Sequence, residues 1–162
     1  MSSIFQNQTA VLRRAAAALG DLPVRGLVTT GRAIDPGQLR VPANVRAVRA
    51  APHSVLLPLA AAVITHAGHG TVLKALAAAV PLVCMPQGRD QKDNAARVLR
   101  LGAGVRVKPG SAPPAIAAAV RTVREDPQYR AAATAAAHQL AQDASRAPSA
   151  ADETEALLLS AR

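Results

Sequence analysis

Apolar positions along the chain form short runs typical of strands, separated by longer stretches with helical spacing. The strand-like segments are residues 22–30, 44–49, 63–65, 81–85 and 104–107. The segments of helical composition between and around them are residues 8–19, 52–59, 71–79 and 91–101. Short strands that alternate with helices predict an α/β fold: a single Rossmann-like domain, with a parallel sheet and helices on both faces.

After the last strand the pattern is helical. The first helical segment carries apolar residues at spacings of four and three, which are Ile116, Val120 and Val123. Asp126-Pro127 predicts the start of another helix that runs to about Asp143. Residues 144–150 have the composition of a linker, and Ser149 is a candidate cap for a last short helix. We therefore expect a Rossmann-like domain over residues 1–147 and a linker with a short helix over 148–162.

A glycine turn lies near the middle of the chain, where VITHAGHGTVL spans residues 63–73. The pattern predicts a buried strand, a tight turn and the first turn of a helix. Gly68 and Gly70 allow backbone angles and close approach that a Cβ atom would forbid. The free N–H groups and the dipole of the helix start favour an anion, most often phosphate. The spacing matches neither the GxGxxG nor the Walker A motif.

A second polar loop, PQGRDQ at residues 86–91, follows the next predicted strand. That strand, 81–85, is apolar throughout, as expected of a strand buried on both faces. Both loops follow strands, so both should open on the same edge of the sheet. The first loop offers backbone N–H groups, a hydroxyl and an imidazole, which suit phosphate. The second offers a carboxylate, an amide and a guanidinium, which suit sugar hydroxyls.

Composition narrows the classes of function. Aromatic residues make up 1% of the chain, which leaves no aromatic platform for stacking bases. The formal net charge is +9, but the arginines are scattered, so a solvated basic surface is favoured over nucleic-acid binding. The single cysteine, Cys84, lies in an apolar run and is expected to be a buried structural thiol. No segment has the pattern of a signal peptide or the length of a membrane span, so we expect a cytoplasmic protein.

The two loops, taken in order and spacing, resemble the C-terminal, donor-binding half of the UDP-glycosyltransferase-like family (GT-B fold, glycosyltransferase family 1). The matching pieces are APHSVLLPLAAAVITHAGHGT, ALAAAVPLVCMPQGRDQKDNAARV and LGAGVRV. The resemblance is closest over residues 44–107 and extends over almost the whole chain. It implies inverting transfer of a hexose from a nucleotide sugar to a small-molecule acceptor. The helix terminus would stabilise the departing diphosphate without a metal or another cofactor.

The same resemblance implies roles for matched positions. Expected contacts of the donor diphosphate are His66, Gly68, Gly70 and Thr71. Expected contacts of the donor sugar are Asp90 and Gln91, while Asn94 is expected to orient the loop. Candidates for the nucleoside pocket are Ala51, His53 and Lys74. No catalytic residue is expected in this chain, because in this family the base and the acceptor pocket belong to the N-terminal half.

Three positions depart from the family pattern. Ala50 stands where many relatives have a stacking aromatic residue. Lys74 stands where many have a glutamate for the ribose hydroxyls, and a lysine cannot accept those hydrogen bonds. Ala79 replaces a common glycine. Each site residue also has a structural interpretation: His66 could close the end of the strand, and Asp90 could cap the following helix. His69 is expected to be exposed or to make a minor contact with the ligand.

Several functions therefore stay open. The first is the donor half of a glycosyltransferase that binds a UDP- or TDP-sugar and works with a separate N-terminal acceptor domain or subunit. A homodimer through the exposed interdomain face is another form of partner. The second is an interaction module, or a subunit of a split enzyme, that has lost donor binding. A nucleotide-sugar epimerase would need the same pocket, and a nucleic-acid-binding protein would need a contiguous arginine face.

Overall fold

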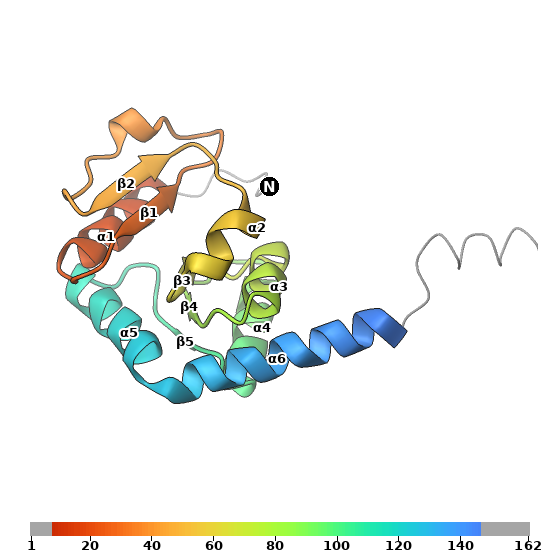
Figure 1. The fold of residues 1–162 in the computed structure, drawn as a ribbon. Coiled ribbons are helices and arrows are strands. Elements are labelled where there is room, and N and C mark those ends of the chain that lie inside the picture. The colour runs from red at the N-terminus through yellow and green to blue at the C-terminus, as the bar shows by residue number, and fades with distance from the viewer. Residues whose placement is uncertain (1–7, 147–162) are drawn as a thin grey trace, which may run out of the picture.

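The computed structural model describes residues 8–146, so the predicted linker beyond Arg146 and the last helix lie outside the described residues. The helices are α1 (Gln8–Gly20), α2 (His53–Leu56), α3 (His69–Ala77), α4 (Gln91–Arg100), α5 (Pro113–Glu125) and α6 (Pro127–Arg146), with 3-10 turns η1 (Pro36–Gln38) and η2 (Leu57–Leu59). The strands are β1 (Gly26–Thr29), β2 (Val45–Val48), β3 (Val63–Thr65), β4 (Leu82–Cys84) and β5 (Gly104–Arg106). Strands and helices alternate along the chain, which confirms the predicted α/β class (Figure 1).

Every strand pair is parallel, as predicted, but hydrogen bonding divides the strands into two sheets. One is the pair β1-β2, and the other has the order β3-β4-β5. In the second sheet Val63 pairs with Leu82, and Leu82 pairs with Gly104. The expected single sheet is therefore present in two parts, with no ladder between β1 and β3 in the described residues.

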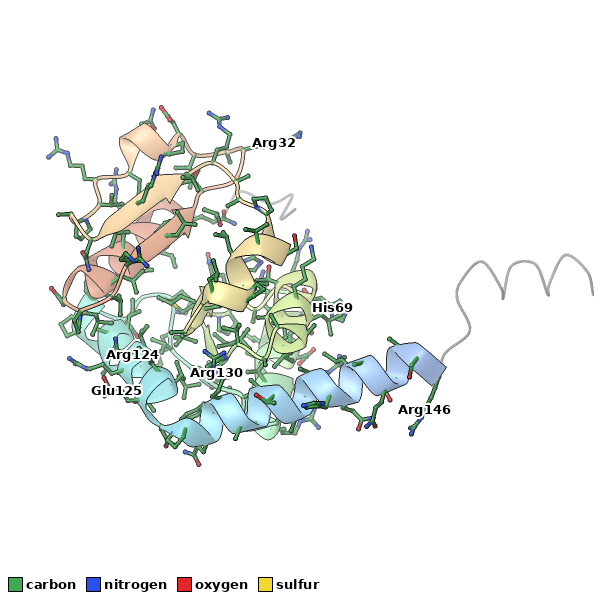
Figure 2. All side chains as sticks on the ribbon, viewed as in Figure 1. Arg32, His69, Arg124, Glu125, Arg130 and Arg146 are labelled. Carbon is green, nitrogen blue, oxygen red and sulfur yellow. The ribbon has the colours of Figure 1, made fainter. Side chains whose placement is uncertain are left out.

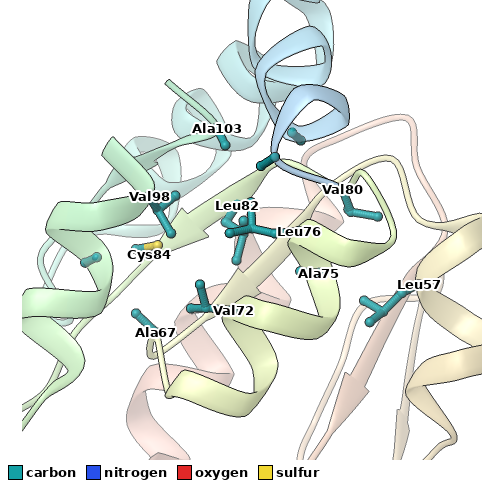
Figure 3. Close-up of a cluster of buried hydrophobic side chains, with 13 residues drawn as sticks. Leu57, Ala67, Val72, Ala75, Leu76, Val80, Leu82, Cys84, Val98 and Ala103 are labelled. Atoms are coloured by element: carbon teal, nitrogen blue, oxygen red, sulfur yellow. The ribbon is translucent and has the colours of Figure 1, made fainter. Parts of the chain in front are cut away.

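Helices cover both faces of the three-stranded sheet. Side chains alternate along β4, so Leu82 and Cys84 pack with α3 and α4, while Val83 packs with α5 on the other face. Figure 3 shows the first of these clusters, in which Val72 and Leu76 of α3 lie close to Leu82. All three β4 residues are buried, which confirms the prediction of a strand buried on both faces. The pair β1-β2 has α1 on one face, with Ala16, Val28 and Val45 in a third cluster.

Two helices end in the same hydrogen-bond motif with different residues at its left-handed position. After α4, the N–H of Gly102 (φ 69°) donates to Leu99 O, and the N–H of Ala103 donates to Val98 O. After α3, the left-handed position is Ala79 (φ 55°), in the same Schellman arrangement. Ala79, which replaces a glycine common in the family, therefore holds a Cβ atom in a strained conformation.

Some boundaries differ from the predictions for local reasons. The segment 22–30 was expected to be a strand throughout, but β1 begins at Gly26 because a turn, with Val24 N donating to Leu22 O, precedes it. The N-cap of α2 is Pro52, and Ser54 lies inside the helix. The sequence placed Ala95, Val98 and Leu99 on one face of α4, but Leu99 is exposed while the other two are buried.

Candidate functional site

The turn between β3 and α3 leaves backbone N–H groups without a hydrogen-bond partner among the described residues at the start of α3. Gly68 is the N-cap, and its carbonyl accepts from Thr71 N and Val72 N at 3.0 Å each. No hydrogen bond joins the N–H of His69 or Gly70 to another described residue. These groups point out of the first turn of the helix, where its dipole is positive. This backbone arrangement is the one that the sequence predicted, and the binding of an anion at it stays a prediction.

The two glycines of the turn serve different needs. A Cβ atom on Gly68 would lie 2.6 Å from Nε2 of His66, so a larger residue would displace the imidazole that packs over Gly68. A Cβ atom on Gly70 would meet nothing within 4 Å, so the space above this residue is open. Gly68 has a φ of −64°, which any residue can adopt, and the left-handed angle falls on Ala67 (φ 65°). The close approach of the His66 imidazole therefore explains the glycine at position 68, and an unusual backbone angle does not.

Ala67 is held in its strained conformation from two sides. Its N–H donates to the hydroxyl of Thr65 at 3.2 Å, and its carbonyl accepts from Asn94 Nδ2 at 3.1 Å. Asn94 is buried on α4 and also donates to Asp90 Oδ2 at 2.9 Å. Asn94 thus connects the glycine turn to the second polar loop, in keeping with the loop-orienting role expected of it. The part played by Thr65 was missed, although a threonine two residues before a turn is a known turn signal.

The second loop is organised by its own side chains. Gln91 is buried, and its Oε1 accepts from Gln87 N at 2.8 Å and from Gly88 N at 3.2 Å. Asp90 is exposed and stands at the N-cap of α4, but its side chain makes no capping hydrogen bond. The side-chain capping role considered for Asp90 is therefore wrong. One oxygen of Asp90 and the NH2 group of Gln91 remain for a ligand.

His66 joins the two loops electrostatically. The imidazole is half-buried, and burial lowers the pKa of His66 below its ordinary value, while the nearby carboxylate of Asp90 opposes part of that shift. His66 is therefore neutral at pH 7, with one ring nitrogen able to donate and the other able to accept. The side chain of Thr71, the next expected diphosphate contact, is half-buried in the first turn of α3.

The nucleoside-pocket candidates lie on neighbouring elements. Ala51 and His53 are half-buried at the start of α2, and α2 continues into η2, whose Leu57 packs against α3. Lys74 is exposed on α3, one turn after Gly70. In the described residues no hydrogen bond connects Ala51, His53 or Lys74 to the glycine turn. The structure thus brings the expected diphosphate and sugar residues together, and it places the nucleoside candidates on neighbouring elements.

His69 belongs to another surface. Its side chain, labelled in Figure 2, lines a mostly apolar hollow of about 240 Å³ between α3, α4 and α6. Within the described residues no three His, Cys, Asp or Glu side chains are grouped so that they could hold a metal ion. Over the same part of the chain, none of the helices combines the length and the apolar character that crossing a membrane requires.

Comparisons with known proteins show the family of the chain. A family model described as Erythromycin biosynthesis protein CIII-like, C-terminal domain, matches residues 14–158. The chain belongs to this family. It is 39% identical over 121 residues to 4'-demethylrebeccamycin synthase of Lentzea aerocolonigenes, an alignment that covers 74% of this chain and 28% of that protein.

Solved structures show the same relationship. CalG4, the calicheamicin glycosyltransferase, matches with a TM-score of 0.85 and 32% identity, over 98% of this chain and 42% of that one. The glycosyltransferase VinC, solved in complex with DTDP, matches with a TM-score of 0.70 and 28% identity, over 78% of this chain and 32% of that one. The chain thus has the fold and sequence of the C-terminal domain of a GT-B glycosyltransferase. It spans well under half the length of these relatives.

Proposed function

We propose that this domain is the donor-binding half of an inverting GT-B glycosyltransferase, which transfers a hexose from a UDP- or TDP-sugar to a small-molecule acceptor. The observation that carries the proposal is the start of α3. There the N–H groups of His69 and Gly70 have no partner among the described residues, and no side chain covers Gly70. A diphosphate placed above the turn would accept both hydrogen bonds and would meet the positive end of the helix dipole.

Neutral His66 supports the same assignment, because it can donate a hydrogen bond to a phosphate oxygen. As the bond between the sugar and the diphosphate breaks, negative charge grows on the departing phosphate. Donors fixed in advance stabilise that charge at no cost in reorganisation. The binding of DTDP by VinC supports a nucleoside diphosphate as the ligand class.

The second loop would hold the sugar. Asp90 is exposed and retains a free carboxylate oxygen, and its position is fixed by the hydrogen bond from Asn94. Sugar hydroxyls are donors, so a carboxylate next to the diphosphate is a suitable partner for them. Gln91 would contribute only its NH2 group, because its oxygen already accepts two backbone N–H groups. Its larger role would be to shape the loop.

The acceptor and the catalytic base would come from a separate N-terminal domain or subunit. In its absence the domain should bind the donor weakly and transfer sugar poorly, because nothing positions the acceptor. The rival interpretation is an interaction module that no longer binds the donor. Exposed Lys74, one turn from the proposed diphosphate site, is the observation that favours it, since lysine cannot accept the ribose hydroxyls.

Calorimetric titration with UDP, TDP and GDP tests the proposal. We expect one nucleotide to bind, and we expect His66→Ala to weaken it by at least about tenfold, the value of one hydrogen bond to a charged group. His138→Ala, a change at an exposed histidine of α6, is the matched control and should bind as the unmodified chain does. If a folded chain binds none of the three nucleotides at millimolar concentration, the donor site is not functional and the interaction-module interpretation leads.

A further inference from the structure

The hollow that His69 borders is enclosed by α3, α4 and α6, and its walls are mostly apolar. Helix α6 packs along α3 (Figure 1), and it faces the core with the small side chains of Ala133 and Ala136. Because alanines fill little of the space between the helices, a volume of about 240 Å³ stays open among the described residues. The larger apolar side chains that line it are Val72, Leu73, Leu76, Val98, Leu101 and Leu140.

Two leucines of the hollow are unusually exposed. Leu101, the C-cap of α4, is 50% exposed, and Leu73 of α3 is 38% exposed. A segment that covered both side chains would remove apolar surface from water, which is favourable. A cavity of about 150 Å³ lined by aliphatic side chains is large enough for benzene. The hollow is larger than that, so it has room for one or two branched aliphatic side chains.

The polar part of the lining carries positive charge and no negative charge. Arg97 of α4 is exposed and lines the hollow, and none of the lining residues is acidic. Within residues 8–146 the structure has one ion pair, between Arg124 and Glu125, so Arg97 has no carboxylate partner there. Asp143 of α6 already accepts a hydrogen bond from Nε2 of Gln139 at 2.7 Å. A segment that fits this surface should therefore carry carboxylates next to apolar side chains.

Residues 151–162 of the same chain have this composition. Their sequence is ADETEALLLSAR, and three of the ten acidic residues of the whole chain lie at positions 152–155. Three leucines follow at positions 157–159. At helical spacing Glu153 lies one turn before Leu157, and acidic residues in a first turn favour a helix. Such an amphipathic segment is of the kind that lays its apolar side chains into a groove between helices.

We propose that residues 151–162 dock into the hollow of their own chain as a short helix. Leu157 and Leu158 would enter the space between α3, α4 and α6, and the carboxylates at positions 152–155 would lie toward Arg97. The docked segment would cover the exposed leucines and supply the negative charge that the rim lacks. The inference does not rest on the binding of a nucleotide sugar.

The connection is long enough for this contact. Leu140 lies six residues before Arg146, which is about 9 Å along the axis of α6. Residues 147–156 can span up to about 33 Å, so they can lead back to the hollow. Pro148 disfavours the helical conformation of the residue before it, which favours a change of direction directly after α6. Because docking within one chain is intramolecular, the linker keeps the local concentration of the segment high and modest contacts are enough.

Amide hydrogen exchange of the full chain, read residue by residue by NMR, tests the docking. A helix of about twelve residues is marginal in water by itself, so the amides of Leu157, Leu158 and Leu159 report whether the segment is held. We expect these amides to exchange at least about tenfold more slowly than in a synthetic peptide of residues 147–162. Nuclear Overhauser contacts between the methyl groups of Leu158 and Leu101 should show the docked position directly.

Matched variants test the surface itself. Leu101→Ser should remove most of the protection, because it replaces the more exposed of the two leucines by a polar side chain. Leu59→Ser is the control, since it makes the same change at an 81%-exposed leucine of η2 that does not line the hollow. Arg97→Glu should lower the protection by about two- to fivefold through like-charge repulsion, and Arg121→Glu, at an exposed arginine of α5, should not. Circular dichroism checks that each variant is folded.

Three outcomes would overturn the proposal. The first is free exchange of the three leucine amides in the unmodified chain. The second is protection that a folded Leu101→Ser chain retains, since the segment would then be held elsewhere. The third is protection that grows with protein concentration, since the hollow would then receive the segment of a second copy. Nucleotide titration is a separate measurement, so failure of the donor site would not be confused with any of these.

Discussion

Substitution of Gly70 by alanine separates the stability of the fold from the proposed binding of a diphosphate. Gly70 is the second residue of α3, and a Cβ atom built there meets nothing within 4 Å. The added methyl group therefore costs no contact in the unbound domain. It does project into the space from which a ligand would reach the N–H groups of His69 and Gly70. The same change should thus affect folding and binding in opposite directions.

The two effects have different magnitudes. Alanine is favoured over glycine within a helix by roughly 0.5–1 kcal/mol, and somewhat less in the first turn. For a domain of this size, that corresponds to a rise in Tm of about 1–4 °C. Loss of one hydrogen bond between an N–H group and a charged phosphate oxygen costs about 1.5–3 kcal/mol, or roughly 10- to 150-fold in Kd. The methyl group would block at least one such bond.

Thermal unfolding followed by circular dichroism gives the first quantity, and calorimetric titration with the nucleotide that the unmodified chain binds gives the second. Gly37→Ala is a suitable control, because a Cβ atom there meets only Asp35, at an ordinary 3.6 Å. It should leave the affinity unchanged. A Gly70→Ala domain that gains stability and still binds with unchanged affinity would refute the placement of the diphosphate above this turn. A large fall in Tm would refute the description of Gly70 as open.

Three further results are expected. In urea unfolding, Ala79→Gly should raise the free energy of unfolding by about 0.5–1 kcal/mol, and Gly102→Ala should lower it by about 1 kcal/mol. Both residues occupy the left-handed position of the same helix-ending motif, so a change of the same sign in the two variants would contradict this explanation. Burial lowers the pKa of His66, so the contribution of neutral His66 to the stability of the fold should be present above pH 6.5 and lost as the pH falls below 6.5. An NMR titration that gives His66 a pKa above 6.5 would contradict this. Burial raises the pKa of Cys84 to about 12, so the thiol should react with a disulfide reagent only on unfolding, and rapid labelling of the native chain would contradict this.

The sequence predicted the centre of the fold well because local signals and burial agree there. Val63–Thr65 was expected as a strand and is β3, and the segment 81–85 contains β4. Glycine at Gly68 and Gly70 marked the turn, and the apolar run marked a strand buried on both faces. These features depend on a few adjacent residues. Such features can therefore be predicted without knowing how the rest of the chain packs.

Features that depend on distant residues could not be predicted. The local sequence offers only the hydroxyl of Thr65 as a signal for the left-handed angle of Ala67, and the second hydrogen bond that holds Ala67 comes from Asn94, 27 positions away. The division of the sheet into two parts was missed for a similar reason. Alternation of strands and helices indicates that strands are parallel, but not which strands are neighbours. The exposure of Leu99 likewise follows from how α4 sits on the sheet rather than from its spacing.

The hydrogen bonds around Asn94 give the site a property that neither loop has alone. From Ala67, at the turn expected to hold the diphosphate, a hydrogen bond leads to Asn94, and a second leads from Asn94 to Asp90, at the loop expected to hold the sugar. The charge of Asp90 in turn acts on His66, whose ring packs over Gly68. These contacts link the same few residues of the two loops, so a shift of either loop must disturb the other. A donor held by both loops would therefore have the bond between its sugar and its diphosphate fixed at both ends, which is the positioning that sugar transfer requires.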